Sequence, residues 1–273
     1  MNPKLPILIE LIFVMIAGIV YFLTSNPFFI LNFLYIGTAI SLGLFLMQSN
    51  HRHGRNIIML AIGSYLFFYV GIYQHENISM SGFWYYLFLG VFEAAVIHFL
   101  VAKIIGPLIF GRGWCGYACW TAMVLDLLPY KTPQGDRKNW GHFRYLLFCA
   151  ILCLVAALFI FKIKNIEIIM FYLFIAGNLI YYIVGIALAY SLKDNRAFCK
   201  YVCPITVFLK ISSYFSLLRI KVNSDKCNEC MKCVKKCPMD VEILENSRKR
   251  NNGTECILCL ECSKNCPQNA IKI

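Results

Sequence analysis

Long apolar runs alternate with short polar connections along the first 192 residues. Six runs approach or exceed the roughly 20 residues needed to cross a hydrocarbon core; they cover residues 5–23, 28–47, 56–73, 83–105, 144–163 and 168–192. A short amphipathic stretch follows over residues 207–218, and residues 219–273 contain no long apolar run. The pattern predicts an α-helical membrane bundle of six transmembrane helices in residues 1–218, followed by a small polar domain in residues 219–273.

Composition supports a chain that lies mostly in lipid. Hydrophobic residues make up 59% and charged residues 15% of the 273 residues, against roughly 45–50% and 25% in soluble proteins, and the mean hydropathy is +0.64. Intrinsic disorder is excluded, because it goes with low hydrophobicity and high charge. The net charge of +12 comes from basic residues that cluster at the ends of apolar runs. We interpret them as topology signals and lipid-facing anchors, not as a nucleic-acid surface.

The basic residues also predict an orientation. The connections 49–55 and 111–144 are rich in Lys and Arg, whereas 24–27 and 74–82 contain neither residue. The positive-inside rule therefore predicts a multi-pass protein of a prokaryotic inner membrane, with both termini and the two basic connections in the cytoplasm.

An internal repeat emerges when the chain is shifted by 84 positions, so that GRGWCGYACWTAMVLDLLPY (111–130) aligns with NRAFCKYVCPITVFLKISSY (195–214). The matched pairs include Arg112 with Arg196, Cys115 with Cys199 and Cys119 with Cys203. Each copy follows two predicted helices and leaves them on the same side, so the repeat is parallel. We expect the two copies to face each other across a pseudo-two-fold axis normal to the membrane.

Eight of the fourteen cysteines form two copies of one pattern, C-x2-C-x2-C-x3-C-P. The first copy is Cys227, Cys230, Cys233 and Cys237, and the second is Cys256, Cys259, Cys262 and Cys266. This is the run of bacterial ferredoxins, in which three thiolates bind one [4Fe–4S] cluster and the fourth reaches the neighbouring cluster. The spacing predicts an α+β two-cluster ferredoxin domain, with cluster I on the first three cysteines and Cys266, and cluster II on the last three and Cys237. A zinc module and a disulfide knot are the less favoured alternatives; zinc sites usually pair two C-x2-C units rather than repeat a four-cysteine run.

Four further cysteines, Cys115, Cys119, Cys199 and Cys203, are called the edge cysteines below because they follow the ends of the predicted fourth and sixth spans. Together they supply the four thiolates of one more cluster, so a third iron–sulfur or other metal centre is a candidate here. A redox-active dithiol, a copper or zinc site and simple burial remain open, whereas a cytoplasmic location disfavours a structural disulfide.

Ionisable and thiol side chains within the predicted spans are the remaining candidates. Glu93 and His98 lie in the fourth range, and charged or polar groups at membrane depth usually face a cavity or a partner. They are candidates for a quinone or proton site, with a structural role as the alternative. Cys149 and Cys153, one turn apart in the fifth range, are interpreted as buried small apolar residues, with an extra ligand pair as the alternative.

With these residues, the chain resembles the membrane-bound 4Fe–4S polyferredoxins, which include the NapH-type proteins and the nitrous-oxide-reductase regulators. The resemblance covers roughly residues 83–273 and depends on GRGWCGYAC, AFCKYVCP and the two ferredoxin runs. In that family the edge motif is usually C-x3-C-P; Cys203 is followed by proline, whereas Cys119 is followed by Trp120. The resemblance implies electron transfer coupled to a membrane partner.

The sequence therefore predicts a membrane-anchored electron relay, with the oxidoreductase activity of a subunit rather than a complete enzyme. Electrons would pass between a cytoplasmic donor such as a ferredoxin or flavoprotein and a quinone or a partner membrane redox subunit. The alternatives are an assembly or maturation factor that supplies electrons or metal to a metalloenzyme, and a thiol redox sensor.

Overall fold

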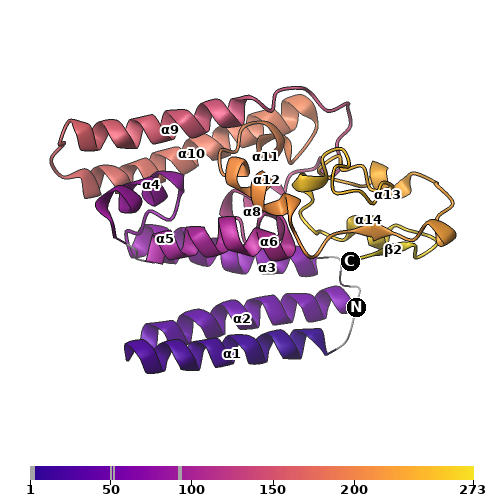
Figure 1. Cartoon of the computed structure of the whole chain (residues 1–273), viewed down its shortest axis with the longest axis horizontal. Helices are drawn as coiled ribbons and strands as arrows, with labels where there is room; N and C mark the ends of the chain where they lie inside the picture. Colours follow the sequence, from indigo (N-terminus) through magenta and orange to yellow (C-terminus); the bar gives the residue numbers. More distant parts are fainter. Residues whose placement is uncertain (1–3, 50, 52, 92–93) are drawn as a thin grey trace.

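Five helices in the described part of the chain are long and apolar enough to cross a membrane. The computed structural model describes residues 4–49, 51, 53–91 and 94–273. The five helices are α1 (Leu5–Thr24), α2 (Pro27–Gln48), α3 (Gly54–Ser64) with its π-helical continuation η1 (Tyr65–Tyr73), α9 (Phe143–Ile160) and α10 (Ile166–Leu192). Helices are thus confirmed in five of the six predicted ranges, and Figure 1 shows them lying along the long axis of the molecule.

The first two helices form a pair beside α3. α1 and α2 pack on each other and α2 packs on α3, and Figure 1 shows this pair on the side of the molecule away from α9 and α10. Glycine permits the close approach, because a Cβ at Gly43 would overlap the side chain of Ile58. Large apolar side chains such as Leu8 and Leu31 are exposed on this pair, which suits a protein of the membrane.

The prediction of one helix over residues 83–105 is wrong. α4 (Met80–Leu89) ends at Gly90, whose φ of +71° lies in the left-handed region that commonly terminates helices. A second helical stretch then runs through α5 (Ala94–Phe99), the π-helical η2 (Leu100–Ile105) and α6 (Gly106–Phe110). A hydropathy pattern shows one continuous apolar run because glycine interrupts the helix without lowering the hydrophobicity. The sixth crossing stays a prediction.

Short helices follow at the end of the bundle where the ferredoxin-like part begins. α7 (Gly113–Tyr117) and α8 (Trp120–Leu125) follow α6, and α11 (Ala197–Tyr201) and α12 (Thr206–Tyr214) follow α10. α7 and α11 have the same length and are offset by the 84 positions of the predicted repeat. The repeat itself stays a prediction.

The C-terminal residues form the small α+β unit that the cysteine spacing predicts, drawn at one end of Figure 1. Strands β1 (Lys221–Val222) and β2 (Ile271–Lys272) pair antiparallel, with Val222 opposite Ile271. The helical turns are η3 (Ser224–Lys226), α13 (Lys232–Lys235), η4 (Gly253–Glu255) and α14 (Glu261–Lys264). One hydrophobic cluster joins this unit to Leu209 of α12 and to Cys115 of α7. The predicted boundary at residue 219 therefore separates two parts along the chain, but the apolar side chains of both parts form one common core.

Candidate iron–sulfur site

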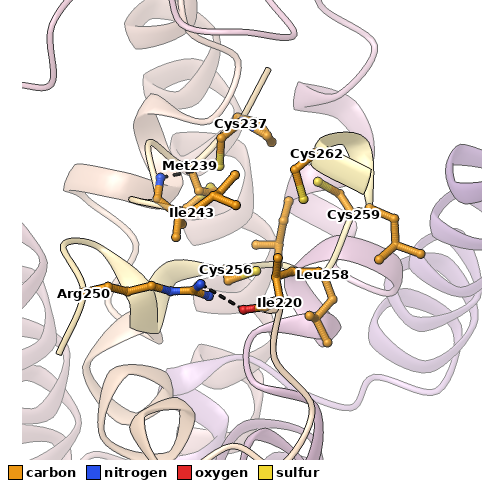
Figure 2. Close-up of a pocket in the computed structure, with 13 residues that line it drawn as sticks. Ile220, Cys237, Met239, Ile243, Arg250, Cys256, Leu258, Cys259 and Cys262 are labelled. Carbon is orange, nitrogen blue, oxygen red and sulfur yellow. Dashed lines mark hydrogen bonds between the residues drawn. The ribbon is translucent and has the colours of Figure 1, made fainter. Parts of the chain in front are cut away.

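The four cysteines predicted to hold cluster II line one pocket. Cys256, Cys259 and Cys262 come from the second run, and Cys237 comes from the first. Figure 2 shows their side chains converging from different segments of the chain, beside apolar neighbours such as Met239. The combination of three cysteines from one run with one from the other matches the exchange typical of two-cluster ferredoxins.

The four cysteines predicted to hold cluster I line a second pocket. Cys227, Cys230 and Cys233 belong to the first run, and Cys266 belongs to the second. Cys230 is exposed, and only Cys233 of this set is buried. In the cluster II set, by contrast, only Cys256 is not buried. The second pocket thus lies nearer the protein surface than the first.

Both runs follow the same unusual backbone path. Non-glycine residues in the left-handed region occur at matching positions, namely Glu229, Met231 and Asp240 in the first run and Leu258, Leu260 and Asn269 in the second, with φ between +48° and +64°. Such residues each carry a conformational cost and concentrate at functional sites. Alternation of the two helical regions turns successive N–H groups to one side, which makes a concave site for an anion. The backbone is therefore shaped for negatively charged, thiolate-ligated groups.

The donor set fits iron–sulfur clusters. Each pocket presents thiols among apolar side chains, and backbone N–H groups point at sulfur: Val241 N lies 3.4 Å from Cys237 Sγ, and Ala270 N lies 3.4 Å from Cys266 Sγ. Within the described ranges, no group of three or more His, Cys, Asp or Glu side chains is arranged around a single metal ion.

The edge cysteines lie on the two short helical segments and the turns that follow them. Cys115 and Cys199 occupy the centres of α7 and α11, and both are buried. Cys119 caps the start of α8, and Cys203 precedes Pro204. Cys115 and Cys199 belong to one buried cluster, and the neighbouring Cys115 and Cys119 raise the pKa of Cys203.

Two buried arginines connect the copies of the predicted repeat. Arg112 Nη2 lies 3.4 Å from the carbonyl oxygen of Cys199, and Arg196 Nη1 lies 2.9 Å from that of Cys115. Each arginine thus donates to the partner motif. Arg196 Nη1 also lies 3.9 Å from Cys199 Sγ. Both guanidinium groups are nearly inaccessible to solvent, so they bring positive charge to the edge cysteines.

The thiols of Cys199 and Cys203 are protonated when they carry no metal. Burial raises the pKa of Cys199 to about 12, although Arg196 opposes the change. Burial and the neighbouring Cys115 and Cys119 raise the pKa of Cys203 to about 11. Metal binding displaces such protons, because the thiolate is the ligand.

A buried carboxylate joins the cluster II pocket to the edge cysteines. Glu255, next to Cys256, pairs with Arg137 at 2.6 Å, Arg144 at 2.9 Å and Arg112 at 3.8 Å. Burial alone would raise the pKa of Glu255, but these arginines outweigh it and lower the pKa to about 2. The carboxylate is therefore ionised and fixes the ferredoxin-like unit on the bundle.

Three more contacts hold the same junction. Tyr117 donates a hydrogen bond of 2.8 Å to the carbonyl oxygen of Leu258. Lys200 of α11 pairs with Asp240 of the ferredoxin-like unit at 2.6 Å. Gly116 lies against Ile257, whose carbonyl oxygen a Cβ at Gly116 would overlap. Gly116 and Ile257, which follow Cys115 and Cys256, are thus in direct contact.

The other predicted residues have mixed outcomes. Glu93 lies outside the described residues. His98, on α5, packs edge-on against Trp114 with ring centroids 5.0 Å apart, so it lies near the edge cysteines. Its role in a quinone site stays a prediction. Cys149 and Cys153 are exposed on α9, which corrects their interpretation as buried residues: their side of the helix is not covered by protein.

Sequence reasoning missed two charged residues. Glu255 was not singled out, because its partners are distant in the sequence, although an acidic residue directly before a cluster cysteine was a usable signal. Lys103 is also buried near the edge cysteines. It is the sole charged residue between Ala94 and Phe110, and a charge at that depth is itself a signal of function.

Comparison with known families agrees with the geometry. The 4Fe-4S dicluster domain family matches residues 219–268, which include both ferredoxin runs. The 4Fe-4S binding domain family matches residues 93–133 and 177–223, which include the edge cysteines. The fold and these matches define an iron–sulfur electron-transfer protein.

Individual relatives support the same class. A protein of Methanocaldococcus jannaschii of uncharacterised function is 28% identical over 178 residues, covering 62% of this chain and 68% of the relative. YccM of Escherichia coli, named as an electron transport protein, is 25% identical, covering 55% and 48%. The methylamine utilization ferredoxin-type protein MauN of Paracoccus denitrificans is 24% identical, covering 53% and 54%.

This chain thus spans about half the length of the two relatives whose names describe a role. No solved structure matches it. Its two 4Fe–4S ferredoxin-type domains and its electron-transport relatives confirm the resemblance to the membrane-bound 4Fe–4S polyferredoxins.

Proposed function

We propose that this chain relays electrons across the cytoplasmic edge of a membrane, between a cytoplasmic donor and a quinone or a partner membrane redox subunit. The single observation that carries the proposal is the direct contact between the cluster II pocket and the edge cysteines, through Glu255, Tyr117 and Gly116. Electron transfer needs short distances between carriers, and this junction holds the two cysteine sets close together.

The residues divide into three ligand sets in this proposal. Cys227, Cys230, Cys233 and Cys266 would hold one cluster, Cys256, Cys259, Cys262 and Cys237 a second, and the edge cysteines a third. Each [4Fe–4S] cluster supplies a one-electron carrier when bound. The chain supplies the thiolates, the N–H groups aimed at sulfur and the apolar walls that keep water away.

Surface charge favours an acidic donor. Cys230 is exposed, and Lys226, Lys232, Lys235 and Lys236 lie close to it in the sequence. Positive charge near an exposed carrier steers a negatively charged partner toward it. The set that contains Cys230 is therefore the proposed entry point, and a small acidic ferredoxin or flavoprotein is the proposed donor.

The orientation of the chain belongs to the same proposal. Arg55, from the first basic connection, donates to the carbonyl oxygen of Gly116 and pairs with Asp126, in the second basic connection, at 2.8 Å. The basic connections and the ferredoxin-like unit thus gather at one end of the bundle, and the positive-inside rule places that end in the cytoplasm.

Reconstitution tests the relay. Full-length protein, loaded anaerobically in vesicles that contain a quinone, is mixed with a reduced acidic ferredoxin, and quinone reduction is followed. We expect reduction that depends on the protein and falls with rising salt, because exposed charges are screened. Cys230→Ser is the matched variant, and its rate should drop at least tenfold. Clusters that accept electrons but pass none to any quinone would contradict quinone as the acceptor.

A further inference from the structure

Lys103 is a buried cation beside the edge cysteines. It lies on η2, and its side chain is 2% exposed. Its Nζ atom lies 4.5 Å from the centroid of the Trp114 ring. The residue after that tryptophan is Cys115, so the ammonium group lies against the ring of the residue that precedes the first edge cysteine.

No carboxylate neutralises this ammonium group within the described residues. The buried carboxylates Glu255 and Asp126 have other partners: Glu255 pairs with Arg112, Arg137 and Arg144, and Asp126 pairs with Arg55 and Arg196. A buried, unpaired charge is costly, and a cation–π contact offsets only part of that cost. The site therefore calls for an anion that the ion pairs do not supply.

The charged groups that act on Lys103 are the sulfurs of Cys115, Cys119 and Cys203 and the guanidinium of Arg112. Of these, only the sulfurs can supply that anion. These thiols carry no charge when protonated, but as thiolates on an iron–sulfur cluster they give the whole centre a net negative charge, and net charge is one determinant of the reduction potential. Arg112 and Arg196 also bring positive charge to this site, but each has a carboxylate partner, Glu255 at 3.8 Å and Asp126 at 2.6 Å, whereas no carboxylate among the described residues pairs with Lys103.

Two side chains of one helical segment hold the Trp114 ring in position. His98 and Lys103 are five residues apart on a helix with π-helical character, a spacing that brings both to one face. Both contact Trp114, His98 at a centroid distance of 5.0 Å and Lys103 at 4.5 Å. The π-helical segment thus places the ammonium group of Lys103 beside the Trp114 ring, whereas a regular α-helix would point it in another direction. π-helical segments are frequent at functional sites.

We propose that Lys103 is a positioning residue that supplies the counter-charge of a cluster held by the edge cysteines and raises the reduction potential of that cluster. This inference rests on the proposed function. Reduction adds one electron and no proton to the centre, so a fixed positive charge nearby stabilises the reduced form more than the oxidised form. The centre would then accept electrons readily from the ferredoxin-like unit.

Three variants of the full-length protein test this proposal by anaerobic iron analysis and EPR redox titration. Lys103→Gln removes the charge, Lys103→Arg keeps it, and Lys164→Gln removes a charge in the turn between α9 and α10 as the control. We expect Lys103→Gln to lower the equilibrium constant for reduction of the edge centre at least tenfold, about 59 mV for one electron. Lys103→Arg should stay within threefold of wild type, and Lys164→Gln should not change.

The possible results distinguish a failure of this inference from a failure of the proposed function. If the wild-type protein holds only about eight iron atoms, the third centre does not exist, and this inference is refuted with it. About twelve iron atoms with an unchanged potential in Lys103→Gln would overturn the role of Lys103 alone. If Lys103→Gln loses the centre, recovery of iron in Lys103→Arg supports the counter-charge, whereas loss in both variants shows a packing role and overturns it.

Discussion

Arg196 donates a hydrogen bond of 2.9 Å to the carbonyl oxygen of Cys115, although 81 residues separate the two. The same guanidinium group pairs with Asp126 at 2.6 Å. Burial alone would raise the pKa of Asp126, but Arg196 and Arg55 outweigh it and hold that pKa below its ordinary value. One arginine therefore connects the two edge motifs and keeps a buried carboxylate ionised.

Replacement of Arg196 should lower both the free energy of unfolding and the iron content. Arg196→Gln leaves Asp126 with Arg55 alone, and breaking a buried ion pair costs about 3–5 kcal/mol. Denaturant titration in detergent measures the free energy of unfolding, and iron analysis should show the loss of about four iron atoms. Arg55→Gln is the matched control, because Arg55 is 17% exposed and pairs with the same carboxylate. Equal losses in the two variants would contradict the special role of Arg196.

The carboxylate of Glu255 should fix the ferredoxin-like unit on the bundle. Glu255→Gln has nearly the same shape but leaves Arg112, Arg137 and Arg144 without their counter-charge, so we expect a loss of about 3–5 kcal/mol. Limited proteolysis around residue 219 should also accelerate. Glu261→Gln, which breaks an exposed pair with Lys264, should cost less than about 1 kcal/mol. Unchanged proteolysis in Glu255→Gln would show that other contacts hold the junction.

The close backbone contact at Gly116 should control the spin coupling between a cluster held by the edge cysteines and the neighbouring ferredoxin cluster. Gly116→Ala places a methyl group against the carbonyl oxygen of Ile257, and the resulting displacement costs about 1–3 kcal/mol. EPR of the reduced protein should show weaker spin coupling between the edge centre and the neighbouring cluster. Gly135→Ala is the control, because nothing lies within 4 Å of its added Cβ. Spin coupling that is the same in both variants would refute the proposed proximity.

The two ferredoxin clusters should differ in their resistance to air. The set with Cys230 is partly exposed, whereas Cys259 and Cys262 of the other set are buried. Since solvent access promotes oxidative loss, we expect the cluster on the exposed set to disappear first during controlled exposure to oxygen. EPR with iron analysis at successive times measures both losses. Simultaneous loss of the two signals would contradict the difference in burial.

The sequence alone predicted the local features of this protein well. A hydropathy pattern depends on consecutive residues, and it placed five helices within a few residues of their observed ends. The cysteine spacing predicted the grouping of Cys237 with Cys256, because the proline after the fourth cysteine directs it away from its own run. Both signals are encoded over short stretches of chain.

Features that depend on distant or special residues were missed. Gly90 interrupts the fourth apolar range by its backbone conformation, which hydropathy does not register. Two partners of Glu255, Arg144 and Arg137, lie 111 and 118 positions away in the sequence, so only the folded chain brings them together. Lys103 is one charge in an apolar run, and its meaning emerges only when Trp114 and the edge cysteines are placed around it.

The central claim is that cysteines of this chain hold iron–sulfur clusters that carry electrons. Iron and acid-labile sulfide counting with EPR, on anaerobically purified wild type and on a variant with all four edge cysteines changed to serine, tests it most directly. We predict about twelve iron atoms in the wild type and about eight in the variant. Zinc or disulfides at the cysteines of the two ferredoxin runs, with no iron signal in folded protein, would contradict the account.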